Sequence, residues 1–231
     1  SPHLTALTFE RFSDTISRLA DVQDSGEVHN MTVYLDNAAT TQVCPQAAQA
    51  ALAVMTEGWG NPSSGYGPGQ SAAARLREDR AAVSDALGCE PEELYFTSCG
   101  TEGDNWSVRA AVEYGRRSGK HIVTSAIEHS AVLEQMKVLE AQGCEITRLM
   151  PDRSGHISAE ALEAALRQDT VLVSLMLVNN ELGTLQPVEE AARAIRRTGC
   201  PALLHTDAVQ AVGNIEIDVA AQNIDMLSLS G

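Results

Sequence analysis

Short apolar stretches alternate with longer amphipathic stretches from residue 94 to residue 229, and this alternation constrains the fold more than any other feature. The short stretches predict strands, and the stretches of about 10–17 residues between them predict helices. Strands that alternate with helices are joined by right-handed crossovers, which produce a mostly parallel sheet with helices on both faces. The expected strands are 94–97, 121–124, 145–149, 171–177, 202–206 and 226–229, and the expected helices are 102–116, 130–142, 159–167 and 188–197. The sequence therefore predicts an α/β protein.

The segment between residues 33 and 87 is less regular. A short strand at 33–35 is expected to run into a polar turn, and helices are expected at 45–57 and 70–87. Between these helices, segment 59–69 is too rich in Gly and Pro for regular structure. A long loop in a compact domain is usually functional or disordered. The Trp and Tyr within this segment favour an ordered binding loop.

The domain organisation is expected to be simple. Residues 1–30 are interpreted as an N-terminal extension or leader, because a polar linker follows a short amphipathic pattern and Met31 precedes the first expected strand. An ordinary N-terminal helix packed on the body is the alternative. Residues 31–231 are expected to form one large domain, since a chain of this length can bury a sizeable core.

Charge and cysteine content exclude several functions. The formal net charge of −15 disfavours nucleic acid, because phosphate binding relies on clustered Lys and Arg. It also argues against an anionic membrane surface, and no apolar run approaches the roughly 18–20 residues of a membrane span. No signal peptide is recognised. The five cysteines are odd in number and lack C-x-x-C spacing, so reduced thiols and a cytoplasmic location are expected, with no metal site.

Polar side chains follow five of the expected strands. Ligands of parallel α/β sheets bind outside the carboxyl ends of the strands, so these side chains form the candidate site. The segments concerned are 98–102, 128–130, 179–181, 207–210 and 228–230. Polar groups of similar size at five strand ends indicate a ligand site more strongly than a polar group at any single strand end.

Segment 97–102, with the sequence TSCGTE, lies between an expected strand and an expected helix. Small residues at such a place let backbone N–H groups and hydroxyls close on an anion at the helix N-terminus. The segment lacks the Gly-Lys-Ser/Thr of a P-loop and the Gly-x-Gly-x-x-Gly of a dinucleotide fingerprint. It is therefore a candidate phosphate-binding turn, with a simple helix cap as the alternative.

Two further strand ends carry groups suited to a planar ligand. His129 opens a helix directly after a strand, where its ring could stack on a planar cofactor and transfer protons. A capping or core histidine is the alternative. Asn180 follows the strongly apolar strand expected at 171–177, and its amide could bond a phenolic oxygen or serve as a turn residue.

Asp207 is the strongest single candidate for function. It follows the apolar residues Leu203 and Leu204, and a carboxylate buried there is costly unless it meets a cation or hydrogen-bond donors. A protonated pyridine nitrogen is such a cation, and pairing with it keeps the ring an electron sink. Gln210 would point the same way if a helical turn begins there. The alternative is an aspartate that caps a helix.

Six segments together resemble the cysteine desulfurases, which belong to the class V group of fold type I pyridoxal-phosphate enzymes. The resemblance runs in unbroken order from about residue 33 to residue 231. The segments are LDNAATT (35–41), GNPSS (60–64), FTSCGTEGDN (96–105), EH (128–129), VNNELG (178–183) and HTDAVQ (205–210). The resemblance implies that the chain is the large domain of such an enzyme.

The phosphate contacts of the cofactor are implied first. Gly100 and Thr101 match phosphate-binding positions of the family, and Ser230 matches a third. Gly100 stands where many relatives have alanine, which leaves an N–H contact unaffected.

The contacts to the cofactor ring are implied in the same way. His129 matches the residue that stacks on the pyridine ring, and Asp207 matches the partner of the pyridine nitrogen. Asn180 and Gln210 match the contacts to the phenolic oxygen of the ring.

The sequence departs from the family pattern at its end. The family has a His-Lys pair after the equivalent of Ser230 and Gly231, and that lysine is the Schiff-base lysine. Lys120 and Lys137 do not match it, and none of the five cysteines matches the catalytic cysteine. The chain is therefore interpreted as an incomplete large domain, truncated before the Schiff-base lysine. It would lack the C-terminal small domain and be inactive alone.

The implied activity is removal of sulfur from L-cysteine, which gives L-alanine and an enzyme persulfide. The sulfur would go to an acceptor protein such as an iron–sulfur scaffold, for iron–sulfur cluster or thio-cofactor assembly. The family is typically homodimeric, and His129 would assist proton movement. A selenocysteine lyase or another class V lyase or aminotransferase is one alternative. A non-catalytic scaffold or dimerisation partner is the other.

Overall fold

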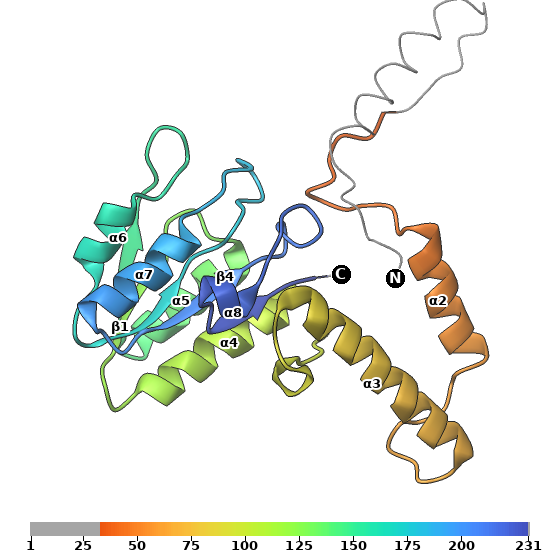
Figure 1. Cartoon of the computed structure of the whole chain (residues 1–231). Helices are drawn as coiled ribbons and strands as arrows, with labels where there is room; N and C mark the ends of the chain where they lie inside the picture. The colour runs from red at the N-terminus through yellow and green to blue at the C-terminus, as the bar shows by residue number, and fades with distance from the viewer. Residues whose placement is uncertain (1–32, 231) are drawn as a thin grey trace, which may run out of the picture. The chain divides into compact units, whose positions relative to one another are not determined.

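The computed structural model describes residues 33–230, which Figure 1 traces in colour. The chain divides into two units, residues 1–40 and residues 41–231. In the described part of the first unit, the N–H of Ala39 donates to the carbonyl of Asp36 over 3.1 Å and forms a turn. The strand predicted at 33–35 is wrong: the structure assigns no strand to these residues. A strand requires a neighbouring strand for its backbone hydrogen bonds, and so short an apolar stretch does not form one alone. The extension predicted for 1–30 lies outside the described residues.

The second unit contains a five-stranded sheet in the order β2-β1-β3-β4-β5, and every pairing in it is parallel. The predicted α/β fold with a parallel sheet is confirmed. The strands are β1 (His121–Ser125), β2 (Glu145–Leu149), β3 (Thr170–Ser174), β4 (Leu203–Asp207) and β5 (Met226–Ser228).

Seven α-helices lie in the described part of the second unit. They are α2 (Pro45–Thr56), α3 (Gly67–Leu87), α4 (Gly100–Gly115), α5 (Ser130–Ala141), α6 (Ala159–Ala165), α7 (Val188–Thr198) and α8 (Val219–Gln222). A short 3₁₀ helix, η2 (Pro91–Glu93), follows α3. Among the described helices, none is both long enough and apolar enough to cross a bilayer.

Helices cover both faces of the sheet, as predicted (Figure 1). Successive residues of a strand point to opposite faces. Ile122 of β1 belongs to an apolar cluster with Val108 of α4 and Val132 of α5. The next residue, Val123, belongs to a second cluster with Ala191 of α7. The chain thus buries one apolar side of each helix against one face of the sheet.

Helix α4 lies close to the sheet because small residues recur along its buried side. The buried residues of α4 are Gly100, Asp104, Val108, Ala111 and Gly115. A β-carbon added at Gly115 would come within 2.6 Å of the Cβ of Val171, so the glycine permits this close approach to β3. The same side of the helix carries one carboxylate, that of Asp104.

The strand predicted at 94–97 is also wrong. Leu94 has an extended backbone, but this stretch joins no sheet and Phe96 is exposed. The guanidinium of Arg80 donates to the carbonyl of Leu94 and lies over the Phe96 ring, 4.8 Å from its centroid. The side chain of Arg80 thus occupies a backbone acceptor that a strand ladder would use.

Helices α2 and α3 bury few of their side chains. Helix α2 has no buried residue, and Leu52 and Met55 within it are 59% and 69% exposed. Helix α3 begins at Gly67, three residues before the predicted start, so the predicted loop 59–69 is shorter than expected. Exposed large apolar side chains gathered on one helix, as on α2, can mark an interaction surface.

Candidate active site at the carboxyl ends of the strands

The parallel pairing brings the ends of β3, β4 and β5 to one edge of the sheet. Ser174 of β3 pairs with His205 of β4, and Asp207 at the end of β4 pairs with Ser228 of β5. The side chains of these four residues are buried. A parallel sheet therefore concentrates polar groups at this edge, as expected for a ligand site.

Asp207 ends β4 and is only 5% exposed. Its Oδ1 accepts the N–H of Val209 over 3.0 Å, which fixes the turn after the strand. Burial raises the pKa of Asp207, and this hydrogen bond opposes the rise. The carboxylate therefore lies where a cationic partner would be favourable.

His129 is both the N-terminal cap of α5 and a member of the site. Its Nδ1 accepts the N–H of Ala131 over 3.2 Å, so a neutral ring carries its proton on Nε2. The two alternatives from the sequence are thus compatible: the ring caps a helix with one nitrogen and leaves the other for a ligand.

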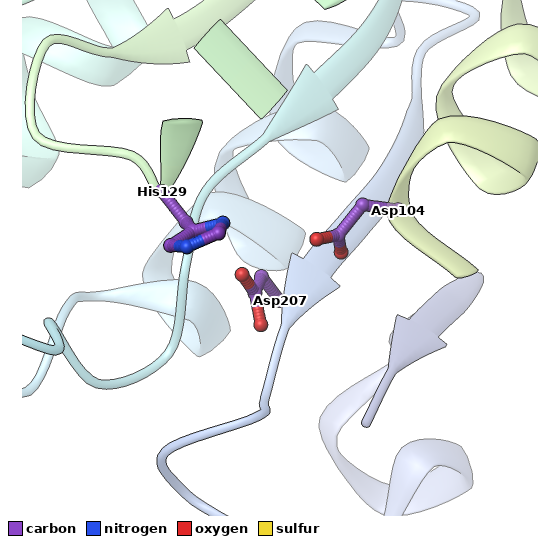
Figure 2. A group of neighbouring side chains, drawn as sticks. All are labelled: Asp104, His129 and Asp207. Carbon is purple, nitrogen blue, oxygen red and sulfur yellow. The ribbon is translucent and has the colours of Figure 1, made fainter. Parts of the chain in front are cut away.

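Asp104 is a functional candidate that the sequence interpretation did not select. Its side chain comes from α4, and one ligand atom from each of Asp104, His129 and Asp207 lies within 4.8 Å of the others. Figure 2 shows these three side chains, here called the Asp104–His129–Asp207 cluster, converging from α4, the start of α5 and the end of β4. Two carboxylates and an imidazole could also ligate a metal ion, so the prediction of no metal stays a prediction.

The carboxylate of Asp104 is 1% exposed, and within the described residues neither of its oxygens has a hydrogen-bond partner. Burial, with the negative charge of Asp207 as a further cause, raises the pKa of Asp104 to about 7. The Ser228 hydroxyl opposes the rise but completes no hydrogen bond to the carboxylate. A buried carboxyl group without donors is a costly arrangement that a ligand could relieve.

Beside Asp104 lies His205, a fully buried residue of β4. Its Nδ1 is 2.9 Å from Ser174 Oγ and its Nε2 is 3.0 Å from Ser228 Oγ. Burial lowers the pKa of His205 to about 4, so the ring is neutral at pH 7. Nε2 is also 3.6 Å from Asp104 Oδ1, which makes the contact a neutral polar one rather than an ion pair.

Gly100 and Thr101 form the first turn of α4, where backbone N–H groups have no partner within the helix. Ser230 approaches the same turn: a β-carbon at Gly100 would be 3.9 Å from the Cβ of Ser230. It would also meet Val209 Cγ2 at 2.7 Å, so glycine at this position lets the turn after β4 come close. The structure thus brings the three predicted phosphate contacts to one place.

Acidic and thiol groups also border this turn. The carboxylate of Glu102 accepts the N–H of Ser98 over 2.6 Å, and this hydrogen bond lowers the pKa of Glu102. The pKa of Cys99 is lowered by hydrogen bonding to the backbone of Glu102. Since the thiol is exposed, it remains accessible beside the predicted phosphate position.

Asn180 and Gln210 lie in the turns that follow β3 and β4, and both are half-buried. Asn179, which precedes Asn180, has a structural role: its Oδ1 accepts the N–H of Leu182 over 2.7 Å, and its Nδ2 donates to the carbonyl of Ile127 over 2.7 Å. The predicted contacts of Asn180 and Gln210 with a phenolic oxygen stay predictions.

Glu128 connects two segments next to the site through hydrogen bonds. It is 5% exposed, and both its oxygens accept the N–H of Met176 over 3.1 Å, while Ser125 donates its hydroxyl to Oε1. Burial raises the pKa of Glu128 to about 8. These bonds join the loop before His129 to the segment after β3.

Both lysines lie away from the cluster. Lys137 is in the middle of α5 and forms an ion pair with Glu134 at 2.6 Å. Lys120 precedes β1, at the opposite edge of the sheet from the strand ends that form the site. Neither belongs to the Asp104–His129–Asp207 cluster.

The residues of the site fit pyridoxal phosphate. The buried carboxyl group of Asp207, whose pKa is raised by burial, suits a protonated ring nitrogen as its cationic partner. The first turn of α4 offers N–H donors to a phosphate. The His129 ring lies within the same cluster. The arrangement can hold a planar ring that carries a positive charge near Asp207 and a phosphate near α4. The imidazole of His129 would then be available for proton transfer.

Comparisons with known proteins agree with this chemistry. Residues 33–231 match the sequence profile described as aminotransferase class-V, a family of pyridoxal-phosphate-dependent enzymes. Cysteine desulfurase IscS of Methanosarcina thermophila is 48% identical over 87% of this chain and 50% of its own length. Cysteine desulfurase of Trichormus azollae is 43% identical over 86% of this chain and 49% of its own length.

Solved structures agree with the sequence relatives. The structure of a NifS-like protein has a TM-score of 0.83 and 38% identity, and the match covers 87% of this chain and 55% of that one. The structure of SspA in complex with cysteine has a TM-score of 0.80 and 37% identity, over 87% of this chain and 57% of that one. The chain spans about half the length of the curated relatives it matches. With its fold, its strand-end site and this sequence match taken together, the chain belongs to the aminotransferase class-V family.

Proposed function

We propose that this chain forms the cofactor-binding part of a pyridoxal-phosphate-dependent cysteine desulfurase. The observation that carries the proposal is the buried carboxylate of Asp207 at the end of β4, within 4.8 Å of His129. Such a carboxylate, which lies beside an imidazole at the carboxyl edge of a parallel sheet, suits a protonated ring nitrogen. The desulfurase relatives, at 40–48% identity, support this activity over other class V reactions.

Each predicted contact has a role in this proposal. Asp207 would pair with the ring nitrogen, and the His129 ring would stack on the cofactor. Gly100, Thr101 and Ser230 would hold the phosphate through backbone N–H groups and hydroxyls at the first turn of α4. Asn180 and Gln210 would donate to the phenolic oxygen. When bound, pyridoxal phosphate supplies an electron sink for bonds at the substrate α- and β-carbons.

His129 would move the protons of the reaction. Its Nδ1 is engaged by the N–H of Ala131, which leaves Nε2 to hold or release a proton on the ligand side. The proposed overall reaction breaks the C–S bond of L-cysteine and forms an S–S bond with an enzyme thiolate. The persulfide then passes its sulfur to an acceptor such as an iron–sulfur scaffold protein, while the carbon skeleton leaves as L-alanine after protonation. The similarity to SspA, whose structure was solved in complex with cysteine, supports the choice of substrate.

The remaining parts of the proposal concern the whole protein. The lysine for covalent attachment, the persulfide cysteine and a small C-terminal domain would lie outside residues 1–231, with residues 31–231 as the large domain and residues 1–30 as an extension. A homodimer is proposed because α2 exposes Leu52 and Met55. A reducing, cytoplasmic location is proposed because the five cysteines are all free thiols.

The test is sulfur release by the full-length protein loaded with pyridoxal phosphate. We expect equal amounts of L-alanine and acceptor-bound sulfur from L-cysteine. Release of selenide from selenocysteine with no reaction of cysteine would move the assignment to selenocysteine lyase. A folded full-length protein that binds no pyridoxal phosphate would overturn the proposal.

A further inference from the structure

Asp104 has no role in the function proposed above, yet its side chain is among the most deeply buried polar groups of the structure. Both carboxylate oxygens lack a hydrogen-bond partner within residues 33–230, and the side chain is 1% exposed. An acid in such a place without a ligand or structural partner is destabilising by itself. Its position on the sheet-facing side of α4 therefore indicates that a further partner is needed.

The orientation of Asp104 indicates where that function lies. The side chain points from α4 toward Asp207 at the end of β4 (Figure 2). It lies against the neutral ring of His205, whose two nitrogens contact the hydroxyls of Ser174 and Ser228. Because a hydroxyl contacts each nitrogen of this ring, the ring is fixed in place and supports the carboxylate of Asp104 beside Asp207.

We propose that Asp104 is a positioning residue of the cofactor site: its carboxylate, held beside Asp207, adds a second negative charge that keeps the ring nitrogen of the bound cofactor protonated. This role rests on the proposed function. It differs from the role of Asp207 because Asp104 acts through its neighbour rather than as the direct partner of the nitrogen.

The charges around Asp104 favour this role. The titratable groups that face it are Asp207 and His205 from β4, His129 from the start of α5, and Glu128 from the loop before α5. His205 is neutral and Glu128 is protonated below about pH 8, so neither supplies the positive charge that two carboxylates require. A cation that arrives at Asp207 would ionise Asp104 as well, since opposite charges within about 4–6 Å favour the charged form.

The test uses the full-length protein loaded with pyridoxal phosphate that carries ¹⁵N in the ring. The ¹⁵N chemical shift, followed from pH 6 to pH 10, reports the protonation of the ring nitrogen. In Asp104→Asn we expect the midpoint of this titration to fall by about one pH unit or more relative to the parent. An unchanged midpoint would overturn the role of Asp104.

A second readout is the affinity for pyridoxamine 5′-phosphate, which forms no covalent bond with lysine. Since cation binding releases a proton from Asp104, the affinity of the parent relative to Asp104→Asn should rise about tenfold between pH 6 and pH 8. A constant ratio contradicts the proposal. Asp104→Ser replaces Asp104→Asn in both measurements if the asparagine variant does not give the circular dichroism spectrum of the parent.

Two controls separate this inference from the proposed function. Asp207→Asn removes the direct partner, so the ring nitrogen should lose its proton over most of the pH range. Glu128→Gln replaces a neighbouring buried acid that is already hydrogen-bonded and is uncharged below about pH 8, so the affinity for pyridoxamine 5′-phosphate between pH 6 and pH 7 should match that of the parent. A parent protein that binds neither cofactor form overturns the proposed function itself. A parent that binds both while Asp104→Asn behaves identically overturns only the role of Asp104.

Discussion

Two buried acids near the same edge of the sheet differ in how their polar atoms are satisfied. Glu128 accepts the N–H of Met176 with both oxygens and the hydroxyl of Ser125 with one. Asp104 is also buried, but within the described part of the chain its oxygens have no hydrogen-bond partner. The carboxyl group of Glu128 thus has its hydrogen-bond partners within the protein, whereas that of Asp104 would need a ligand to supply them.

The comparison shows that a perturbed pKa does not by itself identify a functional acid. The pKa is raised by burial in both residues, to about 8 for Glu128 and about 7 for Asp104. Hydrogen bonding separates them, because a satisfied buried acid stabilises the fold whereas an unsatisfied one requires a partner. The variants below test this distinction, from the largest expected effect to the smallest.

Asp207→Ala in the full-length protein should lower the affinity for pyridoxal phosphate by at least about 100-fold, because a buried ion pair that loses one partner costs about 3–5 kcal/mol. The stability of the cofactor-free protein should change little, since burial already disfavours this carboxylate. Equilibrium dialysis and urea unfolding measure the two quantities. A large loss of stability with an unchanged affinity would make Asp207 a structural residue.

Glu128→Ala should lower the free energy of unfolding by about 3 kcal/mol, because it leaves the buried N–H of Met176 and the hydroxyl of Ser125 without their acceptor. Urea unfolding of the cofactor-free protein provides the measurement. Glu128→Gln, which keeps an acceptor oxygen, is the matched control and should cost much less. Equal losses in the two variants would show that these hydrogen bonds contribute little.

The pH dependence of stability should also report Glu128. Its pKa is about 8 in the folded protein, above the ordinary value of about 4.3 expected in the unfolded chain. The stabilising contribution is therefore complete at acid pH and is lost as the pH rises through 8. Between pH 6 and pH 8 the parent should lose on the order of 2 kcal/mol more than Glu128→Gln. Parallel pH profiles for the two proteins would contradict the raised pKa.

Arg197→Ala should have the smallest effect. The guanidinium contacts Glu163 at 2.6 Å, but the two side chains are 58% and 39% exposed. Exposed ion pairs are screened by solvent and contribute little to stability, so the unfolding free energy should fall far less than in Glu128→Ala, and less still in 1 M salt. A loss comparable to that of Glu128→Ala would show that surface charge rather than buried hydrogen bonding dominates the stability.

The sequence was sufficient to predict the elements whose pattern is local. Strand β2 has the predicted bounds, 145–149, and helices α5 and α7 end within a residue of the prediction. The strands predicted at 33–35 and 94–97 were wrong because an apolar run does not reveal whether a pairing partner exists. In the second case the side chain of Arg80, fourteen residues away, takes the backbone acceptor.

The candidate site was predictable only in part. Asp207 could be recognised because it follows an apolar strand, and the structure places it beside His129. Asp104 was missed, although a signal existed: it lies four residues after Gly100 and four before Val108, on the side of α4 that is otherwise small or apolar. The contact of His205 with Ser228, twenty-three residues away, depends on strand register and could not be predicted from local pattern.

The pairing of β4 with β5 has a consequence for how the protein is made. The N–H of Leu204 donates to Asp225 over 2.7 Å, and His205 reaches Ser228 at 3.0 Å, so the support of Asp104 depends on the strand that is synthesised last among those described. During translation, the first four strands can associate before β5 has left the ribosome. The contacts that support Asp104 therefore form only after residues 225–228 have been synthesised and β5 has paired with β4.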